Sequence, residues 1–440
     1  MSIFAKKTML VILFLVVVGE LIFHIHNLIV FNPYWGYDGP SHIAHIQYIA
    51  THLSNPPLDI YSASNPPLYY WLSAAILKAF NSIKIVQLFS FVLYLIEVIL
   101  MYFLLKKYSD NKFLNISITI FFSLLPVSLE MCYMIFNYPL GNFFSILIIY
   151  MLCIFDFKQV FTYKHAIALG LVIGLGILTS LTNVAFLIAA ILFFLFNPYC
   201  DFKKRIAGAA IVIILCALLV VPYAVYSKKN TQCFLCTTNR VKTKLPISKV
   251  YPIEFYYKFD FSSFSNAYYP NKLYTQGLWT TLHETLYGDY QNYLVGPHLA
   301  SENKNSAGLI LTSPHYVDER KIESLKILNY LGLPISLLFI ITFAISSKRA
   351  IYFIFNKKNR KKYFPDFFLM SIVVLLFAQF MDYLLQYPDY VNIHAGYIYP
   401  LFFIGSLLVV KNFRNKVFTS LISIYVLIYA AVIYGAFWLY

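Results

Sequence analysis

Four side chains that could take part in chemistry follow the first apolar segment of the chain. Asp38, His42, His45 and His52 lie at positions i, i+4, i+7 and i+14 of one stretch. Pro40 suits the first turn of a helix, so this spacing predicts a helix with all four side chains on one face. A carboxylate placed there could act as a general base, because such a base needs only to reach the proton that it removes.

The same residues also allow simpler roles. His42 and His45 could bind a metal, hold a phosphate as imidazolium ions, or merely face water. Asp38 could serve only as the cap of the helix, since Asp is a favoured capping residue. His24 and His26, near the outer end of the preceding apolar run, add two imidazoles at a similar depth and keep the metal interpretation open.

These residues belong to a very apolar chain. Of its 440 residues, 60% are hydrophobic and only 12% are charged, and the mean hydropathy is +0.67. Ordinary soluble domains contain roughly 45–50% apolar residues and about 25% charged residues. The composition therefore excludes a soluble enzyme and predicts an integral membrane protein.

Eleven apolar runs approach the length of roughly 20 residues that a membrane helix needs. They cover residues 9–31, 87–105, 113–132, 139–155, 166–181, 184–197, 206–226, 327–346, 367–386, 396–410 and 417–438. We expect an all-α integral membrane protein with about eleven transmembrane helices. The first run is longer than the core of a signal peptide and no typical cleavage site follows it, so we interpret it as an uncleaved anchor.

The basic residues predict the orientation in the membrane. With the N-terminus inside, the short inner connections carry 20 Lys and Arg, whereas the short outer ones carry only Lys78 and Lys84. Positive residues gather on the cytoplasmic side of membrane proteins. The net charge of +15 therefore reflects topology and not a nucleic-acid partner. Richness in Asn, Lys, Ile, Phe and Tyr is consistent with a prokaryotic plasma (inner) membrane.

Two outer connections are too long to be simple turns. They divide the chain into an N-terminal membrane module (1–226) that contains the first external loop (32–86), a large external loop (227–326), and C-terminal membrane helices (327–440). In the first loop, Ile43, Ile46, Ala50 and Leu53 form the apolar side of the predicted helix. We expect this amphipathic helix to lie flat on the outer membrane surface, with a second short helix after Pro67.

The motifs of the first loop carry a resemblance. Asp38 follows the first span, His45 to Ile49 read H-x-x-Y-I, and residues 66–70 read P-P-L-Y-Y. This loop resembles that of the GT-C superfamily of integral-membrane glycosyltransferases, in particular the protein O-mannosyltransferase and aminoarabinose transferase branch. Three later stretches are similar to the same superfamily: 170–182, 278–288 and 395–400.

The resemblance implies an inverting glycosyltransferase that moves a sugar from a polyprenyl-phosphate donor to a lipid, glycan or protein acceptor at the outer face. It implies that Asp38 orients or deprotonates the acceptor hydroxyl. Glu130 is a second catalytic candidate, because an ionisable group at membrane depth is costly unless it has a function. The substrate-binding candidates are His42, His45, Asn65, Tyr69, Tyr397 and Asp389.

The chain departs from the family where the donor phosphate would bind. Gly396 and Asn183 replace an Arg and a Lys there. Elsewhere, Gly39 follows Asp38 where many relatives have a second acid, and Asn65 and Ser64 stand where an acid and a His, Gln or Lys are expected. Basic residues of the second loop are another source of positive charge: Arg240, Lys242 and Lys244. A divalent metal also stays open, and Cys233 and Cys236 form either a disulfide or two free thiols.

Two other classes of protein remain as alternatives. A transporter or flippase of a lipid-linked or polar solute would be expected to carry charged groups at mid-membrane and repeated halves. Here the polar clusters lie near the outer ends of the apolar runs instead. A non-catalytic scaffold would account for the missing Arg and the missing second acid.

Overall fold

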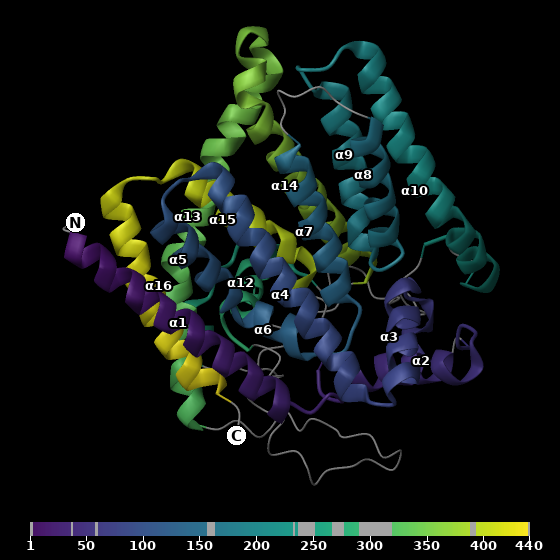
Figure 1. The fold of residues 1–440 in the computed structure, drawn as a ribbon, viewed down its shortest axis with the longest axis horizontal. Coiled ribbons are helices and arrows are strands. Elements are labelled where there is room, and N and C mark those ends of the chain that lie inside the picture. Colours follow the sequence, from purple (N-terminus) through teal and green to yellow (C-terminus); the bar gives the residue numbers. More distant parts are fainter. Residues whose placement is uncertain are drawn as a thin grey trace.

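The structure is a computed structural model that describes residues 3–36, 38–57, 60–155, 163–231, 234–235, 251–265, 277–289, 319–387 and 393–438. Within these ranges every regular element is a helix, so the all-α prediction is confirmed. The long helices pack side by side, and the two helices of the first external loop lie together beyond the ends of α8 and α10 (Figure 1).

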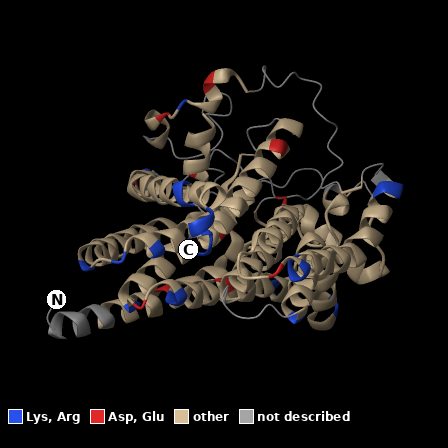
Figure 2. Ribbon diagram, turned by 90° about the horizontal axis from the view of Figure 1, so that it is seen from above, with Lys and Arg blue, Asp and Glu red and all other residues tan. Residues whose placement is uncertain are grey.

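Seven of the described helices are long and apolar enough to cross a membrane. They are α1 (Ile3–Val30), α4 (Ile83–Tyr108), α10 (Phe202–Thr231), α13 (Glu319–Phe355), α14 (Arg360–Gln386), α16 (Lys416–Phe437), and α15 (Tyr399–Asn412) taken together with the short helix η8 (Ala395–Ile398) that precedes it. Their outer sides expose large apolar residues such as Phe14, Leu218 and Ile340. Most charged residues lie toward helix ends (Figure 2), and Glu20 of α1 and Glu97 of α4 are exceptions within helix bodies. Such surfaces suit lipid chains, as in a multi-pass membrane protein.

The other four predicted spans take different forms. Residues 113–132 form two helices, α5 (Lys112–Ser123) and α6 (Pro126–Tyr133), which meet at an angle of 63°. Pro126 explains the break, because proline cannot continue the hydrogen bonding of a preceding helix. The helices α7 (Tyr138–Ile154), α8 (Tyr163–Ile177) and α9 (Val184–Phe196) are apolar but have only 17, 15 and 13 residues. Each predicted run contains a helix, but the count of eleven spans is not confirmed.

Helices α8 and α10 approach closely because α8 carries glycines four residues apart. A Cβ atom added to Gly170 would lie 3.1 Å from the Cα atom of Val212. A Cβ atom added to Gly174 would lie 2.7 Å from the side chain of Leu219. Small residues with this spacing let membrane helices pack backbone to backbone.

The first external loop folds into α2 (Gly39–His52), η1 (Tyr61–Ser64) and α3 (Leu68–Phe80). Ile43, Ile46 and Ile49 of α2 pack in one apolar cluster with Tyr69 and Tyr70 of α3. The histidine side of α2 is buried as well, with His42 only 4% and His45 only 1% exposed. The interpretation in which His42 and His45 merely face water is therefore wrong, because α3 and η1 cover that face. The flat position of α2 on the membrane surface stays a prediction.

Lys84, at the start of α4, holds the end of α1. Its Nζ atom donates to the carbonyls of Leu28, Ile29 and Phe31 at 3.2, 3.2 and 2.5 Å. The last carbonyls of a helix have no partner within the helix, and a cation there is favoured by the helix dipole. Lys84 thus joins the first two long helices just below the first external loop.

The described part of the second external loop consists of η3 (Ile253–Tyr256), η4 (Phe261–Ser265) and α12 (Leu278–Tyr287). Most of α12 is buried against α6, α13 and η8 (Ala395–Ile398). Its His283 lies 2.8 Å from the carbonyl of Asn329, and burial lowers the pKa of His283 to about 4. This part of the loop is therefore packed into the same end of the helix bundle as η8.

Candidate active site

A cavity is formed where the first loop, residues 32–86, meets the ends of four other elements. The loop supplies Asp38, His42 and Asn65. The start of α7 supplies Asn137 and Tyr138, and the turn before α9 supplies Ser180, Leu181 and Thr182. The remaining lining residues are Leu376, Gln379, Phe380 and Tyr383 of α14 and Tyr397 of η8. The cavity volume is about 120 Å³, against roughly 10–15 Å³ for one water. It therefore accommodates several waters or one compact polar group.

Asp38 occupies the capping position of α2 without acting as a side-chain cap. Its side chain makes no capping hydrogen bond, although its main-chain carbonyl accepts from Ser41 and His42 at 2.9 and 3.1 Å. Its φ of 51° is left-handed, a conformation that Asp tolerates better than most residues. The carboxyl side chain lines the cavity instead. A plain capping role does not account for this residue.

A chain of hydrogen bonds supports His42 behind the cavity wall. Asn65 Nδ2 donates to Tyr70 Oη at 2.9 Å, and Tyr70 Oη lies 2.7 Å from His42 Nδ1. Because Tyr70 accepts from Asn65, we assign its single proton to the bond with His42, which leaves the imidazole hydrogen on Nε2. Burial, with a smaller effect of nearby His45, lowers the pKa of His42 to about 3. His42 is therefore neutral at physiological pH.

His45 and Tyr69 lie behind the cavity and are not among its lining residues. The His45 ring stacks on Tyr70 at a centroid distance of 3.7 Å, and its Nδ1 lies 3.0 Å from the carbonyl of Ser62. Burial lowers the pKa of His45 to about 4, although the bond to Ser62 opposes this shift. The Tyr69 side chain is fully buried in the apolar cluster. His42 and His45 are therefore both neutral at physiological pH, and neither could bind a phosphate as an imidazolium ion.

Glu130 also lies outside the cavity lining, in a buried contact with the imidazole of His394. The Oε2 atom of Glu130 is 2.9 Å from His394 Nε2, and the two side chains are 3% and 11% exposed. The other ring nitrogen, Nδ1, accepts the main-chain N–H of Gly396 at 2.9 Å. Gly396 belongs to η8, which carries Tyr397 to the cavity. Glu130 is thus connected to the cavity only through His394 and η8, and its catalytic role stays a prediction.

Tyr397 lines the cavity, together with Asp38, His42 and Asn65 of the predicted set. Its hydroxyl lies 3.4 Å from that of Tyr383, and its ring packs against that of Tyr138 at 5.3 Å. Other residues named in the sequence lie outside the described ranges: Asp389, Cys233, Cys236, Arg240, Lys242 and Lys244.

Six polar lining residues are absent from the sequence prediction: Asn137, Tyr138, Ser180, Thr182, Gln379 and Tyr383. Most are ordinary polar residues beside helix ends, where no motif sets them apart. Gln379 carries a usable signal, because a polar side chain within an apolar run needs an internal partner. Its Nε2 atom donates to the carbonyl of Leu181 at 2.7 Å.

The described residues contain no group of three or more His, Cys, Asp or Glu side chains placed to hold a metal ion. The cavity lining itself has one carboxylate, Asp38, and one imidazole, His42. This donor set does not indicate a resident metal in the described part of the cavity.

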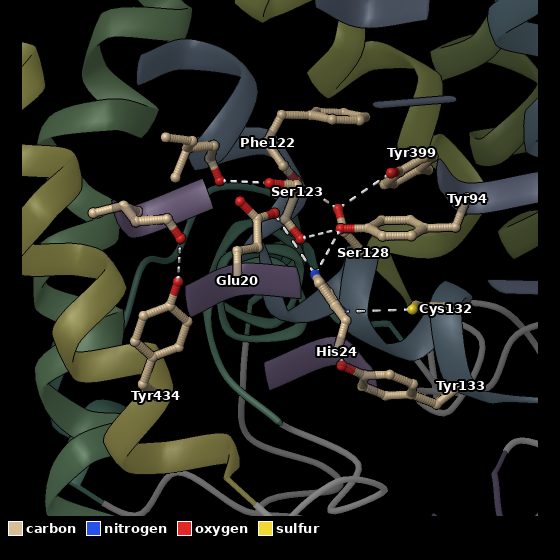
Figure 3. A network of polar contacts seen from close by, with 12 residues as sticks. Glu20, His24, Tyr94, Phe122, Ser123, Ser128, Cys132, Tyr133, Tyr399 and Tyr434 are labelled. Carbon is tan, nitrogen blue, oxygen red and sulfur yellow. Dashed lines mark hydrogen bonds and ion pairs between the residues drawn. The ribbon is translucent and has the colours of Figure 1, made fainter. Parts of the chain in front are cut away.

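A second polar network lies among the helices, and none of its members lines the cavity (Figure 3). His24 Nδ1 lies 2.8 Å from Tyr133 Oη, and His24 Nε2 lies 3.6 Å from Glu20 and 3.2 Å from Tyr94 Oη. Tyr94 also donates to the carbonyl of Ser123 at 2.7 Å. Polar groups within a membrane need such internal partners. The network links α1, α4, α5 and α6, so we interpret it as structural.

Comparison with known proteins decides the family of the central segment. Residues 64–226 match the model of the dolichyl-phosphate-mannose-protein mannosyltransferase family. The resemblance to the GT-C superfamily is confirmed. This GT-C segment is less than half of the chain; it contains Asn65, Tyr138 and Ser180 of the cavity, whereas Asp38 and α14 lie outside it.

Further comparisons add less. ArnT from Cupriavidus metallidurans, whose structure is known in the apo state, is 11% identical to this chain, with a TM-score of 0.42. The similarity covers 92% of this chain and 78% of that one. No curated protein matches the sequence.

Proposed function

We propose that this protein is an inverting glycosyltransferase that moves a sugar from a polyprenyl-phosphate donor to a lipid, glycan or protein acceptor at the outer membrane face. One observation carries the proposal. The side chain of Asp38 lines a polar cavity among membrane helices and makes no capping hydrogen bond to its own helix. The family match over residues 64–226 supports a lipid-linked sugar as the donor.

The chemistry needs one base. The oxygen of the acceptor hydroxyl attacks C1 of the sugar, and a new C–O bond forms while the bond from C1 to the phosphate oxygen breaks. The bonding electrons leave with the phosphate, and Asp38 takes the acceptor proton. Because the attack is direct, the configuration at C1 inverts, and no second carboxylate is needed to form a covalent intermediate.

His42 supports this step as a neutral donor. The assigned tautomer places a hydrogen on Nε2, while Nδ1 is occupied by Tyr70 at 2.7 Å. The imidazole lies one helical turn from Asp38 and lines the same cavity. It therefore orients a substrate oxygen or the carboxylate of Asp38 without adding positive charge.

The orientation of the site follows from the basic residues. The short connections at the opposite ends of the helices carry 20 of the 34 Lys and Arg residues, which favours a cytoplasmic location for those ends. The cavity then opens toward the outer face of the plasma membrane. A donor with a polyprenyl chain keeps that chain in the bilayer while its sugar phosphate enters the cavity.

The test uses membranes that contain either the parent protein or Asp38→Asn, supplied with polyprenyl phosphates that carry labelled sugars. We expect the parent to release sugar from one donor and the variant to lose at least about a hundred-fold in rate, as expected for removal of a general base. Asn keeps the shape of the side chain and also tolerates the left-handed conformation.

Asp201→Asn is the matched control, since it removes the charge of an exposed carboxylate distant from the cavity lining. It should leave the rate unchanged. Equal rates for the parent and Asp38→Asn would contradict the proposed base, and absence of release from every donor by folded parent protein would favour a transporter or scaffold. The anomeric configuration of the product tests inversion separately.

A further inference from the structure

The described residues of the cavity lining provide many hydrogen-bonding groups and no basic side chain. Ten of its thirteen residues are polar, one of these is the acid Asp38, and none is Lys or Arg. An anionic ligand in this cavity would therefore meet hydroxyl, amide and imidazole groups and no cationic side chain among the described lining residues.

The two positions where relatives place cations are occupied by packed groups. The side chain of Asn183 is fully buried, and its Nδ2 donates to the carbonyls of Gly141 and Ser180 at 3.1 and 3.4 Å. Its Oδ1 accepts from Ser145 at 3.0 Å. The amide thus holds α7 to the turn before α9 and does not line the cavity.

At the second position, Gly396 has no space for a side chain. A Cβ atom there would lie 2.7 Å from His394 Nδ1 and 2.7 Å from the Cε atom of Met131. The imidazole is fixed by its contacts with Glu130 and with the N–H of Gly396 itself. An Arg at this position would require repacking of the wall behind the cavity.

The groups that do line the cavity are suited to a phosphorylated sugar. Ser180 Oγ and Thr182 Oγ1 lie 3.1 Å apart, so one hydroxyl donates to the other and the second keeps its hydrogen for a ligand. Tyr383 and Tyr397 bring two more hydroxyls together. Gln379 Oε1 is buried without a hydrogen-bond partner in the described part of the chain, and a sugar hydroxyl could donate to it.

On the basis of the proposed function, we infer that this protein binds the phosphate of its lipid donor through uncharged hydrogen-bond donors. One donor comes from the pair Ser180 and Thr182 and one from the pair Tyr383 and Tyr397, while Gln379 accepts from the sugar. Oriented dipoles in a site with little water stabilise an anion without a counterion. Hydrogen bonds to charged groups are stronger than those between neutral groups.

An uncharged site has a consequence for the two forms of the lipid. The donor is a phosphodiester with one negative charge, whereas the polyprenyl monophosphate left after transfer gains a second charge above a pKa of about 6. Hydrogen-bond donors without a cation do not offset the larger desolvation of the dianion. The site therefore favours the donor and releases the product as the pH rises.

The test measures binding of labelled polyprenyl monophosphate, a probe that does not depend on the sugar, to the full-length protein in detergent. Binding should weaken at least about five-fold between pH 5 and pH 8, across the second phosphate pKa of about 6. Ser180→Ala, Thr182→Val, Tyr383→Phe and Tyr397→Phe are each measured. Within each hydroxyl pair, loss of the member that donates to the phosphate should weaken binding about ten-fold, as expected for loss of one bond to a charged group.

Three controls separate the uncharged site from its rivals. Tyr226→Phe removes an exposed tyrosine hydroxyl outside the lining and should not change binding. The triple variant Arg240→Ala, Lys242→Ala, Lys244→Ala tests whether basic residues of the second loop bind the phosphate. A chelator tests whether a metal ion binds it. Neither should change binding by more than about two-fold. Thermal unfolding of each variant checks that it is folded.

Binding that strengthens with pH, or a large loss with the triple variant or the chelator, would overturn the inference. So would hydroxyl variants that are folded and bind like the parent. Sugar transfer is measured in parallel on the same samples. A protein that binds the probe as described but transfers no sugar would contradict the proposed function while leaving the uncharged site intact.

Discussion

At the scale of single residues, the charge of Glu130 predicts a role in catalysis, whereas in the structure its carboxylate contacts another side chain, that of His394. The carboxylate contacts His394 at 2.9 Å, and His394 in turn accepts the N–H of Gly396 in the turn that carries Tyr397. Such a residue positions another group, because it reaches the cavity only through its partner. Positioning requires a hydrogen-bond acceptor and not a negative charge.

This difference gives a prediction. Glu130→Gln retains an oxygen that can accept from His394 Nε2, so we expect its kcat to stay within about three-fold of the parent. Glu130→Ala leaves His394 without its buried partner and should lower kcat about ten- to a hundred-fold, the cost of one unsatisfied buried group. Initial rates over a range of donor concentrations separate kcat from KM. Equal losses in both variants would show that the charge itself acts in catalysis.

The buried histidines predict how stability depends on pH. Burial lowers the pKa values of His42 and His45 from 6.5 to about 3 and about 4. Between pH 6.5 and 4 the unfolded chain therefore binds protons that the folded chain does not, so stability is full above pH 6.5 and falls as the pH decreases. Each histidine contributes a slope of up to about 1.4 kcal/mol per pH unit.

Thermal unfolding in detergent across this range measures the effect. His45→Asn removes one of these groups and should make the curve of Tm against pH less steep, even if it lowers Tm at neutral pH. His52→Asn changes an exposed histidine of the same helix and serves as the control. A curve with the same slope in His45→Asn as in the parent would contradict the proposed origin of the acid sensitivity.

At the scale of elements, glycine spacing sets the distance between α8 and α10. Gly170→Leu would place its Cβ about 3.1 Å from the Cα of Val212, which cannot move away as a side-chain tip can. We expect a loss of about 1–3 kcal/mol, the usual cost of overpacking. Gly435→Leu is the matched control, because nothing lies within 4 Å of a Cβ at that position in α16. Unfolding in increasing amounts of a denaturing detergent gives the free energy of unfolding of each variant. Equal free energies for Gly170→Leu and Gly435→Leu would contradict the close packing of α8 and α10.

The elements also show what sequence reasoning can and cannot reach. Hydropathy identifies the apolar runs that contain the long helices, because lipid imposes one rule on all of them, but it does not identify α12 of the second loop. Hydropathy does not predict the angle of 63° between α5 and α6 at Pro126. It also does not predict that α3 and η1 bury His42 and His45 of α2. Asp38, Asn65 and Tyr397 are found by motif, whereas Ser180 and Tyr383 reach the cavity only through the packing of distant helices.

At the scale of the whole molecule, buried polar contacts hold α1 to the rest of the bundle. His24 of α1 contacts Tyr133 of α6 and Tyr94 of α4 (Figure 3). We expect His24→Leu to lower the free energy of unfolding by about 0.6–2 kcal/mol, the range measured for interhelical hydrogen bonds in membranes. Ile29→Leu, at a position that is 70% exposed on the same helix, is the control and should have little effect.

The cross-link formed by Lys84 has a consequence for how this sequence can diverge. The three atoms that receive its hydrogen bonds are main-chain carbonyls of Leu28, Ile29 and Phe31. The contact is therefore independent of the side chains at those three positions. It depends on the ammonium group of Lys84 and on the residue at which α1 ends. Over evolutionary time, exchanges along the last turn of α1 are tolerated by this contact, whereas a single inserted or deleted residue there would shift the acceptors away from the lysine.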